Sequence, residues 1–575
     1  MYGNVQMVHY FSGLRLGRFT MWSTSTRANL GVVLLMSAPL AMSTGATAGF
    51  TWPKLLVVSV GAFVAWTAPP EGRLPRSVLW LGLIGLAWAS ITALASASPL
   101  ASLTGRWPRY EGLPVLALYA ICAGAGARLR RTLSVASATP AAIAALVLLG
   151  LSVASIAHWG PNPGWRTGSV LGNATDQGVF ALTLLGLCLP QFPRQPRLTA
   201  TGVGAALLTV VLSGSRAAML ATLVLLTLVK LPRRWQVASL SMLFGGALAL
   251  PAVRNRLLDS DSWNSRWAIW KDSTALVHDH ALLGVGPSGY MDAIASYQSA
   301  RWFRVGNQGA LDSPHSWVLQ SAVTGGVIGL CLLLGLVALT VRIGLNVRHD
   351  PTSQHLLVTG GCVALALLPN FTSAGTTPLA LAITGAAIAS ERPGSKWSRP
   401  MVLTTTGVVV VVLTMSMVAD RRLHDGLRYA HHGDVAAGVA LLDTANRLTP
   451  WNCDISVMGA QSLTQLADLR SQDAVVPAVT WGQRATDTLP DSGSAWLAYG
   501  VALRTAGDPG RGIAALNQAV VLEPRNSAIY VQRALAHWAA GDLESAGRDL
   551  RRAHRLNPRD PAIRALLSQW RSQQP

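Results

Sequence analysis

Apolar runs of about 16–25 residues follow one another from about residue 30 to residue 420, and about twenty apolar residues suffice for a helix to cross a membrane. Only 13% of the 575 residues are charged, whereas about 25% is usual in soluble domains. The chain is therefore predicted to be an all-α, polytopic membrane protein with about 12–13 spans. Thirteen runs can be counted, centred near residues 40, 62, 86, 119, 145, 183, 205, 222, 244, 329, 362, 383 and 410.

The formal net charge of +20 would suggest a nucleic-acid partner if the basic residues formed one face. They lie instead in short clusters between apolar runs, where such residues set membrane topology. With the N-terminus inside, all seven clusters fall on the cytoplasmic side. The clusters are Arg15/Arg18/Arg27, Arg73/Arg76, Arg128/Arg130/Arg131, Arg194/Arg197, Lys230/Arg233/Arg234, Arg342/Arg348 and Arg392/Lys396/Arg399.

This orientation predicts three regions: a cytoplasmic segment 1–29, a multi-pass membrane domain 30–419 and an extracytoplasmic tail 420–575. Loops between apolar runs also fall on the outer side. They are residues 96–112, 159–176 and 254–316. Because the cytoplasmic loops are short, the chemistry of the chain is expected on the outer side.

The long outer loop 254–316 is about sixty residues long, and loops of such length usually carry function. Arg266 lies in a predicted helix, and His315 leads directly into the next apolar run. The planar guanidinium of arginine binds phosphate oxygens well, and histidine can take a proton from a hydroxyl group. The loop therefore predicts a site for a phosphate-bearing substrate.

Arg216 lies between two apolar runs at the predicted outer face, directly after a Ser-Gly-Ser turn. An arginine that only sets topology would be expected on the cytoplasmic side. We therefore expect Arg216 to share a functional site with Arg266 and His315.

The tail 420–575 is polar and periodic. Helical segments end at Pro450, Pro490, Pro524 and Pro558, and the last two intervals are both 34 residues. A 34-residue helix-turn-helix unit with small residues at the crossing points is typical of tetratricopeptide repeats. Three or four units, of which the second is stretched to 40 residues, predict a short α-solenoid.

Five motifs occur in a fixed order between about residues 100 and 340. They are GRWPRYEGL around Arg109, LGNATDQGVFALTLL around Asn173, LSGSRAAML around Arg216, the Arg266 helix followed by GVGPSGY, and HSWVL from His315. Their order and spacing resemble the O-antigen ligase family, which includes O-antigen polymerases and related oligosaccharyltransferases. Some members of that family also carry a tetratricopeptide tail.

The resemblance implies a GT-C-like membrane glycosyltransferase of the bacterial plasma membrane. Such an enzyme transfers a glycan from a polyprenyl-pyrophosphate carrier with inversion and without a metal ion. It implies catalytic roles for His315, Arg266 and Arg216. It also implies diphosphate- or glycan-binding roles for Arg109, Asn173, Gly286 and Tyr290.

Two positions depart from the family pattern. Ser316 replaces the usual Asn after the histidine, and Thr175-Asp176 replaces a second Asn after Asn173. Neither change removes a proposed catalytic group, and both suggest a different acceptor.

No cofactor or metal is expected. The five cysteines lie far apart without metal-ligand spacing, and the acidic DSDS stretch at 259–262 is interpreted as a solvated loop. The expected partners are the lipid-linked donor and membrane lipids. A glycan, glycolipid, peptidoglycan or protein acceptor is expected as well, and a protein partner could bind the solenoid. A polymerase that extends the lipid-linked glycan and a non-catalytic transporter or scaffold remain alternatives.

Overall fold

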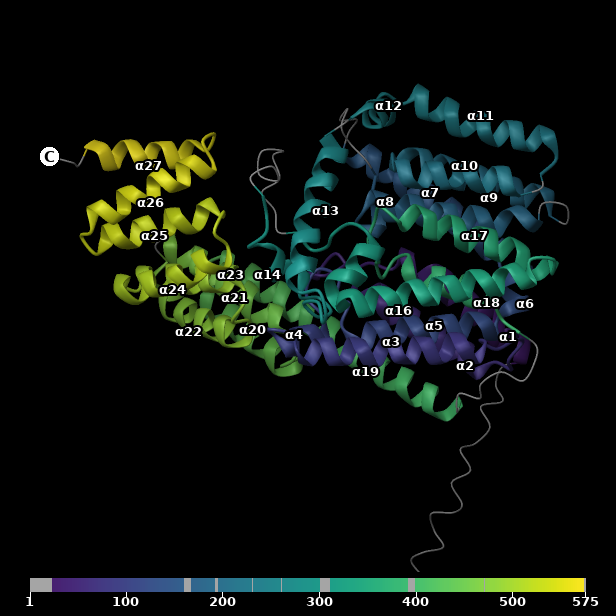
Figure 1. Cartoon of the computed structure of the whole chain (residues 1–575), viewed down its shortest axis with the longest axis horizontal. Coiled ribbons are helices and arrows are strands. Elements are labelled where there is room, and N and C mark those ends of the chain that lie inside the picture. Colours follow the sequence, from purple (N-terminus) through teal and green to yellow (C-terminus); the bar gives the residue numbers. More distant parts are fainter. Residues whose placement is uncertain are drawn as a thin grey trace, which may run out of the picture.

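The structure is a computed structural model that describes residues 23–159, 167–191, 195–229, 231–259, 261–299, 311–390, 399–469 and 471–572. Within these ranges the chain is all-α apart from one isolated bridge between Arg73 and Ser390. A bundle of long helices occupies one half of the molecule, and stacked helical hairpins form the other half (Figure 1). The predicted fold class is confirmed. Most of the predicted N-terminal segment 1–29 lies outside the described residues.

Thirteen helices build the bundle. They are α1 (Thr24–Ser37), α2 (Trp52–Thr67), α3 (Arg76–Leu94), α5 (Leu113–Arg128), α7 (Ala138–Trp159), α8 (Ala174–Cys188), α9 (Pro196–Ser213), α10 (Arg216–Leu228), α11 (Arg233–Ala249), α16 (Trp317–Val347), α17 (Pro351–Leu367), α18 (Thr377–Ala387) and α19 (Arg399–His431). Short helices connect them. They are η1 (Ala38–Leu40), α4 (Pro99–Thr104), α6 (Arg130–Val135), η2 (Ser169–Leu171), η3 (Leu189–Gln191), α12 (Pro251–Leu258), α13 (Asp261–Asp279) and α14 (Tyr290–Ile294).

Each of the thirteen predicted runs corresponds to one of these helices, but fewer helices are complete membrane spans. In the described part of the chain, five helices are long and apolar enough to cross a membrane: α3, α7, α9, α16 and α19. The pair α11 and α12, bent by 86°, would give a sixth. Another five apolar helices have only 10–17 residues. Helices enclosed by other helices need not reach both membrane surfaces, because the protein itself satisfies the adjoining backbone.

The first predicted run was placed too far along the chain. The run was centred near residue 40, whereas α1 ends at Ser37 and a 3-10 turn follows. Pro39 lies in that turn, and a proline cannot donate the backbone hydrogen bond that would continue a helix.

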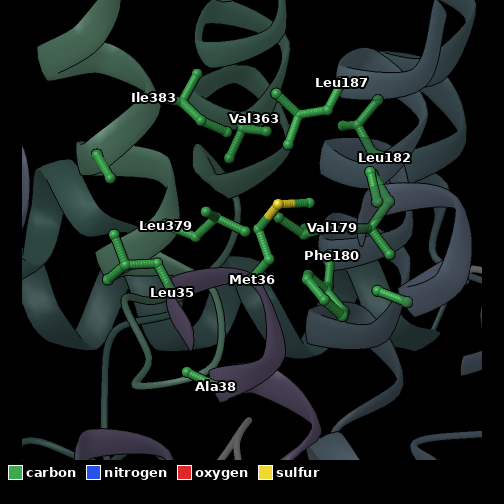
Figure 2. Packing of buried hydrophobic residues seen from close by; sticks show 14 of the residues in the cluster. Leu35, Met36, Ala38, Val179, Phe180, Leu182, Leu187, Val363, Leu379 and Ile383 are labelled. Atoms are coloured by element: carbon green, nitrogen blue, oxygen red, sulfur yellow. The ribbon is translucent and has the colours of Figure 1, made fainter. Parts of the chain in front are cut away.

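The core of the bundle is apolar and continuous. Met36 at the end of α1 is 1% exposed. It lies among Phe180 of α8, Val363 of α17 and Leu379 of α18 (Figure 2). Burial of such side chains stabilises the fold by about 1.5–3 kcal/mol each in a water-exposed domain. In the membrane, close packing has to supply much of that gain.

Arginine side chains close one end of the bundle through backbone carbonyls. Arg27, Arg128 and Arg399 donate hydrogen bonds to carbonyl oxygens between Trp66 and Ala68. This end holds residues from four of the seven predicted cytoplasmic clusters, because Arg73 also pairs its backbone with Ser390. We call the opposite end, onto which the tail packs, the solenoid end.

The tail forms an α-solenoid of helical hairpins. Its helices are α20 (Val435–Leu448), α21 (Cys453–Asp468), α22 (Gln472–Thr488), α23 (Gly493–Thr505), α24 (Pro509–Leu522), α25 (Ser527–Ala539), α26 (Leu543–Leu556) and α27 (Pro561–Ser572). The hairpins α21–α22, α23–α24 and α25–α26 stack in sequence order (Figure 1). The predicted repeat architecture is confirmed.

A Gly-Asp pair closes the turn in three of the four hairpins. The glycine has φ between 82° and 96°, a left-handed conformation that side chains disfavour. The aspartate then caps the next helix by accepting a backbone N–H at 2.9–3.0 Å. The pairs are Gly433–Asp434, Gly507–Asp508 and Gly541–Asp542. The stretched second unit lacks the pair, and Ser471 stands at the N-cap without a side-chain bond.

The first hairpin begins inside a bundle helix. Helix α19 runs without a break from Arg399 to His431, so the expected domain boundary at 419/420 falls within it. Its last turns pack on α20 where Gly426 and Gly438 bring the two backbones together. The carboxylate of Asp420 accepts the backbone N–H of Ala48 at 3.0 Å. The solenoid is therefore a rigid continuation of the bundle.

Candidate active site

The segments predicted to lie outside the membrane meet at the solenoid end. Arg109 of the segment 96–112 pairs with Asp312 of the long loop at 3.0 Å. Arg106 of the same segment pairs with Asp454 of α21 at 2.8 Å. Val170 of the segment 159–176 accepts a hydrogen bond from Lys54 at 2.9 Å. The common location agrees with the predicted grouping of these segments.

Arg266 lies on α13, as the sequence predicts. Within the described residues, the only hydrogen bond of its guanidinium goes to Oδ1 of Asn370, at 3.1 Å. Asn370 is 2% exposed, and its amide is fixed by the carbonyl of Ala366 at 2.6 Å. Burial and the charges of Arg256 and Arg216 lower the pKa of Arg266 to about 10. Arg266 therefore remains a cation at neutral pH, and its hydrogen-bond partner is a neutral amide.

Arg216 begins α10 after the predicted Ser-Gly-Ser turn. Gly214 has φ of 57°, and Ser215 caps the helix. The guanidinium of Arg216 donates to the carbonyl oxygens of Arg256, at 3.1 Å from Nε, and of Asp259. These carbonyls lie at the C-terminal end of α12, where a cation is favourable. Arg216 thereby fixes the start of the long loop.

Three arginines form one positive region. The charges of Arg216 and Arg256 both act on Arg266. Arg256 pairs with Asp259 at 2.6 Å, so one carboxylate compensates part of the charge. A group of arginines with fewer acids than cations favours binding of an anion with several oxygens.

His315 directly precedes α16, also as the sequence predicts. Its backbone has φ of 49°, and its N–H donates to Oγ of Ser313 at 3.3 Å. Ser316, the residue that departs from the family pattern, caps α16 by accepting the N–H of Leu319. A serine performs this task as well as an asparagine, which explains how the departure is accommodated.

The imidazole of His315 is uncharged at neutral pH. Burial lowers the pKa of His315 to about 4. The Asp312 carboxylate opposes this shift, while the charges of Arg266 and Arg109 add to it. A neutral imidazole has a free nitrogen lone pair and can accept a proton.

Arg109 joins the long loop to the loop between α17 and α18. Its Nε and Nη2 donate to Asp312 at 3.0 Å and to Ser313 at 2.7 Å. Its guanidinium carbon lies 3.7 Å from the centre of the Phe371 ring, which is also 5.3 Å from the His315 ring. Arg109 and His315 therefore share one wall of the site.

Gly286 and Tyr290 have structural contacts. Gly286 has φ of 81°, and a Cβ there would lie 2.9 Å from Oγ of Ser102. Its N–H donates to the carbonyl of Thr324 at 3.1 Å. Tyr290 is 1% exposed, and its hydroxyl is bonded to Ser273 at 2.8 Å. These contacts assign both residues to folding of the loop, and a substrate contact by either has no support in the geometry.

The Gly-Val-Gly-Pro turn fills a break in α16. Gly326 has non-helical backbone angles inside this helix. Val285 and Gly286 donate their N–H groups to carbonyls at 323 and 324. The turn thereby replaces helix hydrogen bonds that the break removes. It also fixes the distance between α13 and α16, which carry Arg266 and His315 at their starts.

Asn173 is the N-cap of α8. Its Oδ1 accepts the N–H of Thr175 at 2.7 Å, so it shapes the backbone instead of facing the arginines. Asp176, one turn further, is 5% exposed and has one carboxylate oxygen without a partner among the described residues. Lys54, 1% exposed, and Arg109 both act on this carboxylate. Asp176 is thus linked to the site, while Asn173 supports its helix.

Sequence reasoning missed several residues of the site. They are Lys54, Glu111, Arg256, Asn370 and Phe371. Glu111 accepts hydrogen bonds from Tyr119 at 2.8 Å and Thr372 at 2.7 Å. The only signal for Lys54 and Glu111 is a charged residue next to an apolar run. Asn370 and Phe371 carry no such signal, because their role depends on a loop that is distant in sequence.

An apolar groove of about 430 Å³ adjoins the polar groups. None of the three proposed catalytic residues lines it. Ser316 in its lining follows His315, and Pro369 precedes Asn370, the partner of Arg266. Arg216 is linked to His315 through Arg266. The lining residues are Trp263, Trp270, Ser316, Val318, Leu319, Ala322, Leu330, Leu368 and Pro369.

In the described ranges, no three His, Cys, Asp or Glu side chains gather in a way that could hold a metal ion. Asp259, the first residue of the acidic DSDS stretch, pairs with Arg256. The positive charge at this site comes from arginine side chains.

These features define a membrane protein with a cationic site at one end of a helical bundle and an α-solenoid docked beside it. Residues 201–334 match the family model described as O-antigen ligase. The matched region contains Arg216, Arg266 and His315. The chain therefore carries an O-antigen ligase domain in this part of its bundle.

No curated protein matches the chain. Among solved structures, the first TPR domain of the human RPAP3 protein is 20% identical, with a TM-score of 0.19, over 20% of this chain and 92% of its own. A chain of the APC/C hetero-tetramer Cut9-Hcn1 is 14% identical, with a TM-score of 0.23, over 80% of this chain and 90% of its own. Both TM-scores are too low to define a fold, and the solenoid is assigned from its own hairpins.

Proposed function

We propose that the chain is a glycan ligase of the bacterial plasma membrane. It transfers a glycan from a polyprenyl-pyrophosphate carrier to an acceptor at the outer membrane surface. In this proposal the N-terminus is cytoplasmic, and the solenoid end faces outward. The O-antigen ligase match supports the class of reaction.

One observation carries the proposal: a compensated but net positive arginine group lies beside an apolar groove. Arg216, Arg256 and Arg266 supply the cations, and Trp270 and Leu319 belong to the groove. A lipid pyrophosphate has the same two parts, an anionic head and an apolar chain. Arginine charges stabilise the negative charge that develops on the leaving pyrophosphate, a task that a divalent cation performs in other transferases.

His315 acts as the general base in this scheme. An acceptor hydroxyl oxygen attacks the anomeric carbon from the face opposite the pyrophosphate. The bond between that carbon and the pyrophosphate oxygen breaks, and its electron pair leaves with the pyrophosphate. The hydroxyl proton passes to the neutral imidazole of His315. The anionic head of the donor raises the proton affinity of the imidazole, because an adjacent negative charge favours the protonated form.

A polymerase that extends the lipid-linked glycan would use the same donor site. The docked solenoid favours a ligase, because stacked repeats offer an extended surface to a partner or acceptor. The contact of this solenoid with the segment 96–112 brings that surface close to Arg109.

Glycan analysis of a deletion strain tests the proposal. Complementation with the wild-type gene should restore glycan on the acceptor, and His315→Ala and Arg266→Gln should leave it on the lipid carrier. His278→Ala is the matched control, since His278 is an exposed histidine of the same loop. Full transfer by His315→Ala at normal protein level would disprove the assigned base.

A further inference from the structure

Arg106 joins three parts of the molecule. It is 6% exposed, and its Nε donates to Asp454 of the solenoid at 2.8 Å. Its Nη1 pairs with Asp292 of α14, in the long loop. The second oxygen of Asp454 accepts the backbone N–H of Trp107 at 2.6 Å. The solenoid thus holds both the side chain and the backbone of this segment.

Two other contacts fasten the same segment to the solenoid. Thr104 donates to the carbonyl of Trp451 at 3.0 Å, and Ser98 donates to the carboxylate of Asp491. Asp454 itself lies in the first turn of α21 and is 3% exposed. The attachment therefore extends along the segment and is largely excluded from water.

The backbone between Arg106 and Arg109 is tightly folded. Tyr110 donates its N–H to the carbonyl of Arg106 at 2.8 Å. Its ring is 2% exposed and lies 4.1 Å from that of Trp52. A Cβ at Gly105, which has φ of 96°, would lie 2.4 Å from the backbone of Tyr110. A displacement of Arg106 is therefore passed on to Arg109.

Arg109 in turn holds the residues before His315. It bonds to Asp312 and Ser313, and Ser313 accepts the N–H of His315 at 3.3 Å. The path from Asp454 to His315 thus consists of three printed side-chain contacts and one short, buried stretch of backbone. A contact that only fastened two domains would not need to end at the base.

We infer that Arg106 is a positioning residue through which Asp454 of the solenoid sets the position of Arg109 beside His315. The solenoid is then a part of the active-site wall as well as a surface for partners. The inference rests on the proposed function for its kinetic consequence, but the mechanical coupling itself does not.

The test uses the full-length chain with Asp454→Asn and a matched control, Asp549→Asn. Asp549 pairs with Arg533 at 2.7 Å inside the last repeat and is 6% exposed, so it is a comparably buried ion pair far from the segment 96–112. A displacement of about 1 Å at a catalytic group can cost a hundredfold in rate. We expect Asp454→Asn to lower kcat about tenfold or more, with less than about a threefold change in donor KM. Asp549→Asn should change neither.

A pH profile separates positioning from loss of folded protein. The charged groups that act on His315 are Asp312, Arg266 and Arg109. If Arg109 moves away, one positive charge leaves the imidazole, and the acid limb of kcat/KM should shift to higher pH. Loss of folded protein would lower the whole profile without this shift. An unchanged kcat and an unchanged acid limb in Asp454→Asn would overturn the inference.

Amide hydrogen exchange supplies a readout that needs no activity. Asp454→Asn should speed exchange several-fold at residues 311–316, across the path from the substitution, and Asp549→Asn should not. Equal exchange at 311–316 in both variants would also overturn the inference. If the wild-type protein transferred no glycan but the exchange difference appeared, the proposed function would fail and the coupling would stand.

Discussion

Arg109 lies over the ring of Phe371, with its guanidinium carbon 3.7 Å from the ring centre. The same ring lies 5.3 Å from the imidazole of His315. Phe371 therefore stands between a cation and a neutral base and keeps their spacing fixed. The arrangement joins a segment near residue 109 to a loop more than two hundred residues later.

Arg109→Lys should reduce glycan transfer by about tenfold to a hundredfold. Lysine keeps the charge, but it cannot stack its planar group on Phe371 while it donates to both Asp312 and Ser313. Kinetics with purified protein would show the loss mainly in kcat. Arg234→Lys is the control, since Arg234 contacts only a tryptophan ring at 6.0 Å. Wild-type rates in Arg109→Lys would show that the fork geometry is not needed.

The rate of transfer should fall as the pH is lowered through the pKa of His315. That pKa is lowered to about 4 in the free enzyme, mainly by burial, with help from Arg266 and Arg109. A base acts only when it is neutral, so kcat/KM should stay level down to about pH 5 and then decline. A profile measured from pH 4 to 8 checks this. An acid limb near 6.5 that persists in His315→Ala would assign the titration to another group.

Gly286→Ala should destabilise the protein by about 1–3 kcal/mol. The residue has φ of 81°, and a Cβ would lie 2.9 Å from Ser96 as well as from Ser102. Thermal unfolding in detergent measures the loss. Gly82→Ala is a suitable control, because a Cβ at this helical position meets nothing within 4 Å. Equal melting temperatures for the two variants would refute the role of Gly286 in folding the loop.

Asp508→Ala should loosen the third hairpin by about 1 kcal/mol, since the N-cap of α24 is lost. Asp508 accepts the N–H of Arg511 at 3.0 Å. Hydrogen exchange in the first turn of α24 should become about fivefold faster. Asp473→Ala, at an exposed position after the Ser471 cap of α22, should have no such effect. The cap assignment fails if both variants exchange alike.

The sequence predicts the helices well because their signals are local. Gly-Asp pairs at fixed spacing mark the solenoid turns, and Trp496 and Tyr530, matched at the 34-residue interval, both donate to a proline carbonyl six residues earlier. The number of complete spans is predicted less well. Helix α18 has only eleven residues and is nearly all buried, and hydropathy does not distinguish a short enclosed helix from a span.

The site is predicted in part for the same physical reason. Arg266 and His315 stand at helix starts that the sequence marks clearly. Arg256 and Asn370 acquire their roles from contacts between loops distant in the chain, which no local pattern encodes. Tyr290 was expected to bind substrate, but an aromatic residue in a loop can equally form the core of that loop, and here it is buried with its hydroxyl bonded to Ser273.

The release of polyprenyl pyrophosphate by the purified protein tests the central claim most directly. The protein in lipid bilayers would be mixed with a polyprenyl-pyrophosphate-linked glycan and an acceptor, and the released carrier would be measured over time. We predict release by the wild-type protein, and a loss of about a hundredfold or more in Arg266→Gln. Equal release by Arg266→Gln and wild type would contradict the account.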